Sequence, residues 1–229
     1  MHPTTAGRLR LKAGLIAAFA ALLATGCATQ QASYDYSAFR QSRPASILVL
    51  PPLNSSMEVE ATYSMLSQVT LPLAESGYYV FPVSLVDETF QQNGLHNPGE
   101  MHGVPLAKLH EIFGADAALY IDIKQYGTSY AVLASESRVT AQARLIDLRT
   151  EQTLWQGSAT ASSAEGRDSG GGLIGMLITA VVNQIVESST NRSHPIAGIT
   201  SYRLLRAGTP NGILYGPRSP RYELEATPR

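Results

Sequence analysis

The feature that most restricts the fold is a change of hydrophobic period near the middle of the chain. From residue 117 to 126, apolar and polar side chains alternate, and the same alternation returns over residues 139–145. "TLWQGSATAS", which holds the only tryptophan, Trp155, is a further extended segment. A period of two gives a strand one dry and one wet face, and short turns between such strands favour antiparallel pairing. The sequence therefore predicts an antiparallel meander, with Trp155 in the core.

The segment before the meander has the signals of a strand followed by a helix. "ILVLPP", residues 47–52, predicts a short buried strand, because two prolines end it. The spacing Ser55-x-x-Glu58 is typical of a capping box, so we expect a helix from there to about Ser76. Pro72 lies inside that helix and predicts a kink or break just before it.

A second strand and two more helices are expected before residue 117. "YYVFPV" predicts the strand, and "SLVDETFQQNG" and "VPLAKLHEIFGA" predict short helices that stop at Gly94 and Gly114. A strand-helix-strand unit needs a parallel pair of strands, so the sheet must be mixed. The predicted fold class is α/β (α+β). It is a single domain with a mixed sheet in the order strand-helix-strand-helix-helix, followed by the antiparallel meander and a long buried helix.

The N-terminal residues have the pattern of an export signal. Three basic residues precede an apolar run at residues 13–24, and two small residues then lead to Cys27, the only cysteine. The run is too short to span a bilayer, which takes about 20 apolar residues. "LLATGC" resembles a bacterial lipobox, although Ala24 stands where leucine is usual, and a spare buried thiol is the alternative. We predict that residues 1–26 are a lipoprotein signal peptide and that Cys27 carries lipid, palmitate included.

The chain that remains after cleavage is mildly acidic. Removal of the signal takes away three of the 17 basic residues and none of the 18 acidic ones, which leaves a net charge of −4. Nothing in that balance indicates nucleic acid. Residues 27–43 are polar without periodicity and predict a flexible tether, and residues 44–229 are long enough for one domain. Ala28 stands where aspartate would retain a lipoprotein in the inner membrane. This favours the outer membrane, with the domain facing the periplasm and surface exposure left open.

The stretch "GGGLIG", residues 170–175, fits the dinucleotide-binding pattern G-x-G-x-x-G. A Rossmann site needs that pattern directly after a strand of a β-α-β unit, with an acidic residue about 20 positions later. Here the preceding strand belongs to the meander, and the nearest later acid, Glu187, is too close. The apolar run of residues 170–182 is also too short to cross a membrane. Packing of a helix that is buried on most sides is the preferred interpretation, and no cofactor is expected.

The sequence shows no recognisable set of catalytic or metal-binding residues. His96, His102 and His110 lie close together but lack the spacing of a zinc motif, so we interpret them as solvated loop residues. Asp116 and Asp122 are interpreted as strand-edge residues rather than an acid pair. No serine lies in G-x-S-x-G. We therefore predict that the protein is not an enzyme and has no catalytic, cofactor-binding or metal site.

Several stretches together resemble one protein family. They are "LPPLN", "ATYSMLSQVTLPLAESGYYVFPV", "VPLAKLHEIFGADAALYI", "LIDLRTEQTLWQGSA", "SGGGLIG" and "NGILYGPRSPRY". Over about residues 44–222 the chain resembles a family of bacterial lipoproteins of unknown function. The resemblance implies a compact α/β domain similar to the amino-terminal domain of TolB. It also implies association with lipoproteins like the curli secretion channel CsgG and an accessory role in envelope transport. Only Cys27 maps to a functional position.

Two functions are compatible with these observations. The first is a non-enzymatic interaction module, anchored to the outer membrane, in an envelope transport or assembly complex. Its partners would be the membrane, through the lipid, and envelope proteins, namely a CsgG-like lipoprotein or a second copy of the chain. The alternative is a periplasmic small-ligand or cell-wall-binding domain. An exposed apolar patch or strand edge would favour the module, and a deep apolar pocket with convergent polar groups would favour the ligand binder.

The last part of the chain is rich in proline. Residues 194–229 hold five prolines and several turn signals, which predict a C-terminal tail laid over a surface. The tail also contains too many apolar residues for a free coil. We expect it to dock on the domain, or on a second subunit, through "ILY" at residues 213–215, with only the last few residues loose.

Overall fold

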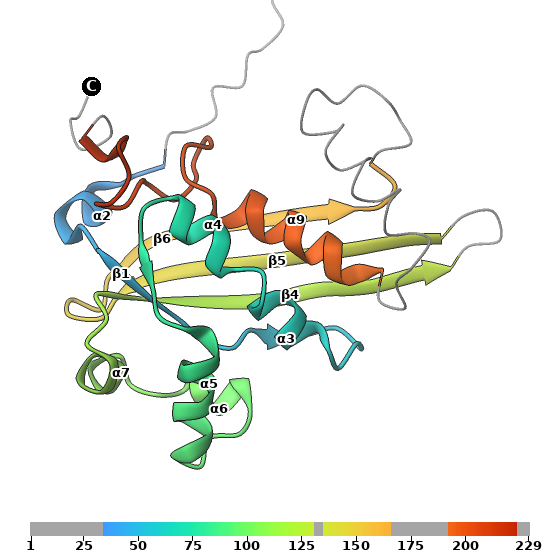
Figure 1. Ribbon diagram of the computed structural model, residues 1–229, viewed down its shortest axis with the longest axis horizontal. Helices are drawn as coiled ribbons and strands as arrows, with labels where there is room; N and C mark the ends of the chain where they lie inside the picture. The colour runs from blue at the N-terminus through green and yellow to red at the C-terminus, as the bar shows by residue number, and fades with distance from the viewer. Residues whose placement is uncertain (1–33, 131–134, 166–191, 224–229) are drawn as a thin grey trace, which may run out of the picture. The chain divides into compact units, whose positions relative to one another are not determined.

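The computed structural model describes residues 34–130, 135–165 and 192–223 of the chain, and the domain begins at Asp35. Its centre is a six-stranded sheet in the order β3-β1-β4-β5-β6, with β2 paired on β4 off this path (Figure 1). Strand β1 runs parallel to β3 and β4, whereas β4, β5 and β6 are antiparallel neighbours. The predicted single α/β domain with a mixed sheet is confirmed. The strands are β1 (Ser46–Val49), β2 (Leu53–Asn54), β3 (Tyr79–Val80), β4 (Ala117–Tyr130), β5 (Ser135–Asp147) and β6 (Thr153–Ser162).

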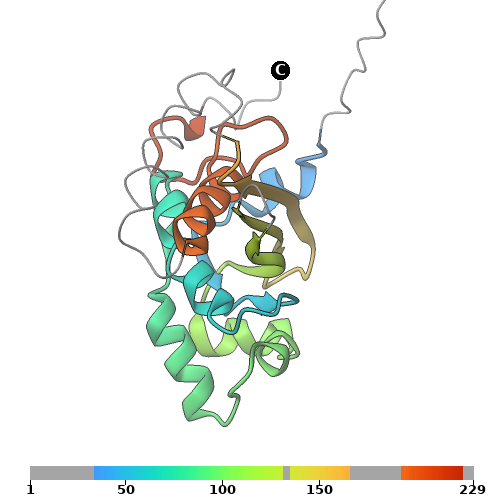
Figure 2. The ribbon, with the colours of Figure 1, turned by 90° about the vertical axis from the view of Figure 1, so that its right-hand side faces the viewer.

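Two groups of helices pack on the sheet. Helix α9 lies along β5 and β6 and also contacts α3 and α4, so these three helices share one face (Figure 2). Helices α5, α6 and α7 cover the other face where β1 and β4 lie. The described helices are α2 (Ser37–Ser42), α3 (Ala61–Leu66), α4 (Thr70–Glu75), α5 (Val83–Gln92), α6 (Pro98–His102), α7 (Leu106–Phe113) and α9 (Ser193–Leu205).

The sheet face under α3, α4 and α9 is the dry face that the alternation predicts. The register aligns Val49 with Leu119 and Leu119 with Leu145, so one apolar row crosses three strands. All three side chains are buried, and each contributes roughly 1.5–3 kcal/mol through loss of contact with water. Trp155 continues the row on β6 and is 2% exposed, which confirms its predicted place in the core.

The opposite face of the sheet is apolar in one part and polar in another. Near β1 it carries a buried cluster with α5, α6 and α7, which includes Tyr120 and Ile146. The register aligns Tyr120 with Arg144 and Arg144 with Gln156, so the same face continues onto β5 and β6. There it becomes exposed and polar. We call this part the open face, and its exposed residues are Gln142, Arg144, Gln156 and Ser158.

The helix expected from the capping box is shorter than predicted and is broken in two. It begins at Ala61, so the capping-box prediction is wrong. The side chain of Asn54 organises the preceding turn, because its Oδ1 accepts from the Ser56 amide at 2.9 Å and its Nδ2 donates to the Glu58 carbonyl at 2.8 Å. The break predicted before Pro72 lies between α3 and α4, at residues 67–69. Pro72 is the third residue of α4, where its missing amide leaves no helical bond unmade.

Two short elements have no counterpart in the prediction. Strand β2 directly follows two prolines, which we expected to end the extended segment. Helix α6 has a clear start, because Asn97 caps it through a bond from the Glu100 amide at 3.0 Å and Pro98 is its first residue. These signals lie in the sequence, but five residues are too few to give a periodic pattern.

The prediction that residues 194–229 form only a tail is wrong for their first third. Helix α9 (Ser193–Leu205) occupies that third and buries Ile196, Leu204 and Leu205. Pro195 is compatible with it because the first turn of a helix has no use for that amide. Thr200 on its buried side donates to the carbonyl of Ile196, one turn earlier in α9, at 2.9 Å and approaches the Val139 carbonyl of β5 at 3.3 Å.

The described remainder of the tail, residues 206–223, docks as predicted. Ile213 is 1% exposed, and the carbonyl of Leu214 accepts a hydrogen bond from the Tyr78 hydroxyl at 2.5 Å. The Gly216 amide donates to the Ser76 carbonyl at 2.8 Å, which places the tail against the turn at Gly77. Gly77 has φ +96, and an added Cβ there would lie 2.4 Å from the Ser219 nitrogen. Only glycine meets both demands.

The described structure starts inside the segment expected to be a tether. Residues 37–42 form α2, and Phe39 is 3% exposed, so the tether boundary at residue 43 is corrected toward the N-terminus. A polar segment can be ordered in this way when a single aromatic side chain and the backbone find partners on the domain. Cys27 and the glycine segment at residues 170–175 lie outside the described residues, as does the predicted long buried helix.

Candidate functional site

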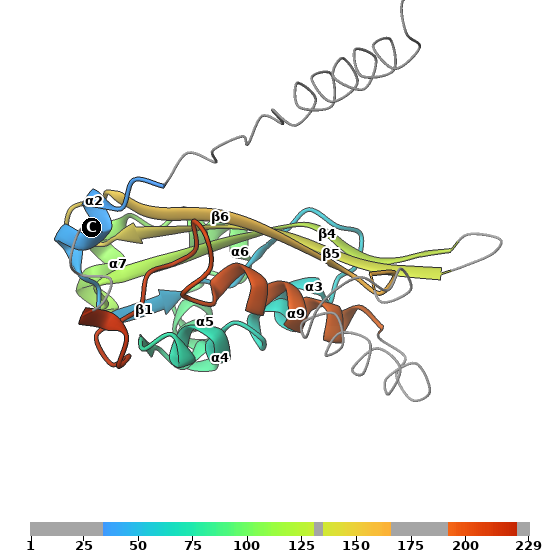
Figure 3. The ribbon, with the colours of Figure 1, turned by 90° about the horizontal axis from the view of Figure 1, so that it is seen from above.

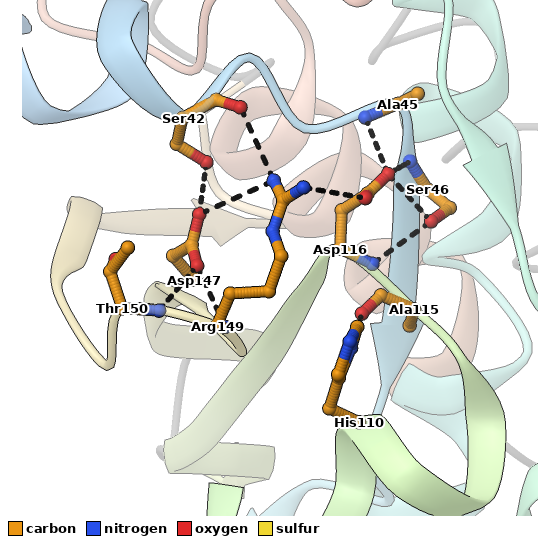
Figure 4. A network of polar contacts seen from close by, with 9 residues as sticks. All are labelled: Ser42, Ala45, Ser46, His110, Ala115, Asp116, Asp147, Arg149 and Thr150. Carbon is orange, nitrogen blue, oxygen red and sulfur yellow. Dashed lines mark hydrogen bonds and ion pairs between the residues drawn. The ribbon is translucent and has the colours of Figure 1, made fainter. Parts of the chain in front are cut away.

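A network of polar contacts holds the N-terminal segment on the sheet. Ser42, the last residue of α2, donates through its hydroxyl to Asp147 at the end of β5 (Figure 4). On the other side of the network, Asp116 accepts from the amides of Ala45 and Ser46, both at 3.0 Å. These bonds join segments about 70 to 105 residues apart in the chain. We call this set the Asp116–Asp147 network.

Arg149 lies between the two carboxylates of this network. Its guanidinium is 3.8 Å from an oxygen of Asp116 and 3.8 Å from an oxygen of Asp147, and it approaches the Ser42 carbonyl at 3.4 Å. The arginine side chain is 47% exposed, so these long ion pairs add little stability by themselves. The network therefore holds the segment that leads to the N-terminus against the sheet. Both of its carboxylates already accept hydrogen bonds or pair with Arg149.

Asp147 is ionised despite being buried. Burial by itself raises the pKa of its carboxyl. Hydrogen bonds from the Ser42 hydroxyl and from the amides of Thr150 and Arg149 lower it by more, so the pKa lies below its ordinary value. Both amides donate to the same carboxylate oxygen at 2.8 Å. A carboxylate with three such donors stabilises the β5–β6 turn and is not available as a catalytic base.

A hollow lies where the apolar part of the second sheet face meets the open face. It encloses about 120 Å³, and its walls include His102, Tyr120, Asp122, Gln142 and Arg144. The Arg144 guanidinium lies over the Tyr120 ring, 5.7 Å from its centre. Burial raises the pKa of the Tyr120 hydroxyl, which the arginine partly offsets, so this hydroxyl is a hydrogen-bond donor at neutral pH. The hollow has the polar groups of a small binding site but not the depth of an apolar pocket.

His102 is a neutral structural group in this hollow. Its Nε2 lies 2.9 Å from the Pro51 carbonyl, which can only accept, so Nε2 carries the proton and donates. The ring packs edge-on against Tyr120 with centroids 5.1 Å apart. Burial lowers the pKa of the imidazole, although the bond to Pro51 opposes this shift. The interpretation of His102 as a solvated loop residue is therefore wrong.

The other predicted candidates have separate places. His110 lies in α7, where its Nδ1 bonds the Ala115 carbonyl at 2.9 Å, and only His96 is an exposed loop residue. Asp116 belongs to the network above, and Asp122 bonds the Ser55 hydroxyl at 3.2 Å and pairs with Lys124. Across residues 34–130, 135–165 and 192–223, no three His, Cys, Asp or Glu side chains are placed to hold a metal ion.

The loop between β2 and α3 exposes two apolar side chains almost completely. Met57 is 99% and Val59 is 92% exposed. The loop lies beside the long strands, because its Glu58 side chain approaches Gly127 of β4 and the adjoining hollow also includes Met57 and Lys124. Single exposed apolar residues are common. Two apolar side chains on one loop, both almost fully exposed, are unfavourable in water and add nothing to the core. No sequence signal distinguished them from the core residues of the following helix.

The described residues thus form a small mixed α/β domain, with its N-terminal segment bonded to the sheet and with exposed apolar and polar surfaces. None of the helices in the described part of the chain is long and apolar enough to pass through a membrane. The chain belongs to the family described as "Putative lipoprotein GNA1162-like", whose model matches residues 34–218.

Two relatives show how close this relationship is. The chain is 49% identical over 206 residues to "Putative lipoprotein NMB1124/NMB1162" of Neisseria meningitidis serogroup B, with 89% of this chain and 95% of that protein covered. The crystal structure of lipoprotein GNA1162 from Neisseria meningitidis is 53% identical with a TM-score of 0.52, and the match covers 63% of this chain and 100% of that one. Both names describe lipoproteins, and neither names an enzyme.

Proposed function

We propose that the protein is a lipoprotein anchored at Cys27 to the outer membrane, with its domain in the periplasm as a non-enzymatic interaction module. Its signal-type N-terminus, its single cysteine and its family support the anchor. Residues 1–26 are removed in this proposal, and the residues between Cys27 and the start of the domain at Asp35 form a short tether. The anchor would be stable because more than one acyl chain on the cysteine exceeds what reversible membrane binding provides.

Replacement of Cys27 by alanine tests the anchor. The variant should leave the membrane fraction, while the wild-type mature protein should show the mass of an acylated Cys27. An unmodified cysteine in the intact mass of the membrane-bound protein would contradict the anchor. The matched control is Ser37→Ala, an exposed position at the start of α2 that should remain bound to the membrane.

The observation that carries the interaction role is the exposed loop with Met57 and Val59. A protein in water gains nothing from full exposure of these side chains, whereas a partner that covers them gains apolar burial. We propose that the partner is an envelope protein of a transport or assembly complex, a CsgG-like lipoprotein or a second copy of the chain. The open face beside this loop supplies polar groups for the rim of such an interface.

A photo-crosslinking residue at position 57 tests this interface in intact cells. It should give one discrete crosslinked species, identifiable by mass spectrometry. The control is the same residue at Leu85, which is 57% exposed on α5 and should give no discrete species. Equal crosslinking at both positions, or none at position 57, would contradict the proposed surface.

The hollow at His102 supports a second candidate, a small-ligand or cell-wall-binding domain. Asp122, Gln142 and Arg144 offer acceptors and donors on one side of a 120 Å³ hollow, as a polar ligand requires. Sedimentation of the protein with isolated peptidoglycan separates the two candidates. Binding that is lost in Arg144→Ala but kept in Met57→Ala would favour the ligand-binding domain.

A further inference from the structure

Two segments meet at one end of the domain, α2 with its flanking residues and the docked tail, and their charged residues are all basic. Residues 36–45 and 206–222 contain five arginines and neither aspartate nor glutamate. This is a strong asymmetry in a chain whose acidic residues outnumber its basic ones. Figure 3 shows α2 and the end of the tail at the same end of the long strands. The five residues are Arg40, Arg43, Arg206, Arg218 and Arg221.

Two of these arginines line one shallow hollow, and two more lie on the tail segment that forms its other wall. Arg40 and Arg43 line it from α2 and its C-terminal cap, and Tyr215 and Tyr222 line it from the tail, around a volume of about 30 Å³. Arg221 joins from the tail, where its guanidinium donates to the Tyr215 hydroxyl at 2.9 Å. Arg218 follows the docked Gly216, and all four arginines are exposed. We call Arg40, Arg43, Arg218 and Arg221 the arginine patch.

Tyrosine rings position three of the four arginines of the patch. The guanidinium of Arg218 lies 5.3 Å from the centre of the Tyr79 ring, and that of Arg221 lies 5.7 Å from the Tyr215 ring. Arg40 stacks on Tyr36 in the same manner at 5.7 Å. In the described part of the chain, no carboxylate forms an ion pair with Arg43, Arg218 or Arg221. All the ion pairs between described residues belong to other groups.

Two of the acidic residues near the patch are already satisfied by other groups. Asp116 and Asp147 are held in the network of Figure 4, where the amides of two segments and Arg149 already satisfy them. Asp35 and Glu223 flank the two arginine-bearing segments at their outer ends. Asp35 bonds the Ser37 amide at 2.9 Å and also attracts Arg40, so it offsets part of the charge of that arginine, whereas no described carboxylate is paired with the other three.

We propose that the arginine patch binds the phosphate groups of anionic phospholipids in the membrane that holds the anchor, an inference that depends on the proposed lipid anchor for its location. Seven residues, 28–34, separate Cys27 from the domain, so their extended length is at most about 25 Å and their mean span as a coil is roughly 15 Å. The patch therefore lies within reach of the headgroups. Guanidinium groups suit phosphate, and tyrosine rings suit the headgroup layer because they are apolar at one end and polar at the other.

Binding of the unlipidated protein to vesicles tests the patch apart from the anchor. The mature chain, residues 27–229 with Cys27→Ala, is floated with vesicles of phosphatidylglycerol and phosphatidylcholine, and with vesicles of phosphatidylcholine alone. It should bind the anionic vesicles only. Each Arg→Gln replacement in the patch should weaken binding by about 5-fold. The quadruple variant at 40, 43, 218 and 221 should therefore lose measurable binding, and added salt should weaken the wild type.

The matched control removes the same charge elsewhere. Lys108→Gln, Lys124→Gln, Arg138→Gln and Arg192→Gln together should bind nearly as well as the wild type. Equal losses in the two quadruple variants, or no binding to anionic vesicles by the wild type, would overturn the patch. If the first quadruple variant unfolds, the pair Arg43→Gln and Arg221→Gln is used, since neither has a carboxylate partner among the described residues. Because no lipid anchor is present in this assay, its failure leaves the Cys27 result unaffected, and the reverse also holds.

Discussion

Strand β5 carries a buried polar side chain at its end and exposed polar side chains nearer its middle. At its end, Asp147 is fully buried and accepts hydrogen bonds from Ser42 and from two turn amides. Five residues earlier, Gln142 lies exposed on the open face. Both residues are in the same strand, so strand propensity does not separate them. Being five residues apart, the two side chains point to opposite faces of the sheet. Asp147 is also covered by the segments that cross the end of β5, namely the chain around Ser42 and the β5–β6 turn.

The comparison teaches that partners decide whether a polar group can be buried in this domain. A carboxylate without partners costs several kcal/mol inside a protein, whereas one with three donors can stabilise a turn. The network end has such donors because the N-terminal segment lies across it. The open face has no such segment among the described residues, and its side chains remain in water, where they are available to a partner.

The largest expected effect is at the turn where the tail docks. Gly77→Ala should lower the free energy of unfolding by roughly 2–4 kcal/mol, because the new Cβ meets the tail backbone and φ is +96. Gly114→Ala is the control, since φ there is +65 but no atom lies within 4 Å, and it should cost only about 1 kcal/mol. Urea denaturation measures both. Equal costs would show that the tail is not held against the turn.

A smaller effect is expected in the Asp116–Asp147 network. Asp147→Asn should cost about 2 kcal/mol at neutral pH, because charge-assisted hydrogen bonds become neutral ones. Its lowered pKa means that its stabilisation is present above the unfolded value of about 3.9 and is lost as pH falls through the folded value. Below that pH, the stability of the variant should therefore fall less than the stability of the wild type. Asp122→Asn, at the edge of the open face, should change the free energy of unfolding by no more than about 0.5 kcal/mol.

The smallest effect is expected at His102, between the apolar cluster and the open face. The lowered pKa of the folded imidazole means that the unfolded chain binds more protons, so stability falls as pH drops below the unfolded value of about 6.5. His102→Gln keeps a donor for Pro51 and should flatten this fall, at a cost of about 1 kcal/mol at neutral pH. Melting curves between neutral and mildly acidic pH measure this change of stability with pH, and His96→Gln is the exposed control. An unchanged slope in His102→Gln would contradict a buried, neutral ring.

Several parts of the fold were predictable from local patterns. The alternation in β4 and β5 predicted both the strands and the dry face, and Gly114 ends α7 in the left-handed conformation expected of a stop. The failures have identifiable causes. Helix α9 was hidden because prolines suggested a tail, and the signal of α6 was too short. His102 was interpreted as a loop residue because no local sequence pattern indicates its hydrogen bond to the Pro51 carbonyl.

The candidate surfaces were less predictable than the fold. Cys27 rests on a sequence pattern that needs no tertiary structure, because a signal peptide is recognised as an extended local segment. The arginine patch could not be found in this way, since Arg43 and Arg221 are 178 positions apart in the chain. They lie in one region only because α2 and the tail both pack on the end of the sheet.

The sequence by itself determined the class of fold, the order of most elements, the core position of Trp155 and the docking of Ile213, because period, glycine stops and apolar content are local properties. Only the tertiary structure decided which polar groups are buried. The bonds from Ser42 to Asp147, from Tyr36 to Gly212 and from Trp155 to Asn211 join residues 105, 176 and 56 positions apart. Hydrogen bonds of that range depend on how the whole chain packs, and a local pattern has no means to specify the partner.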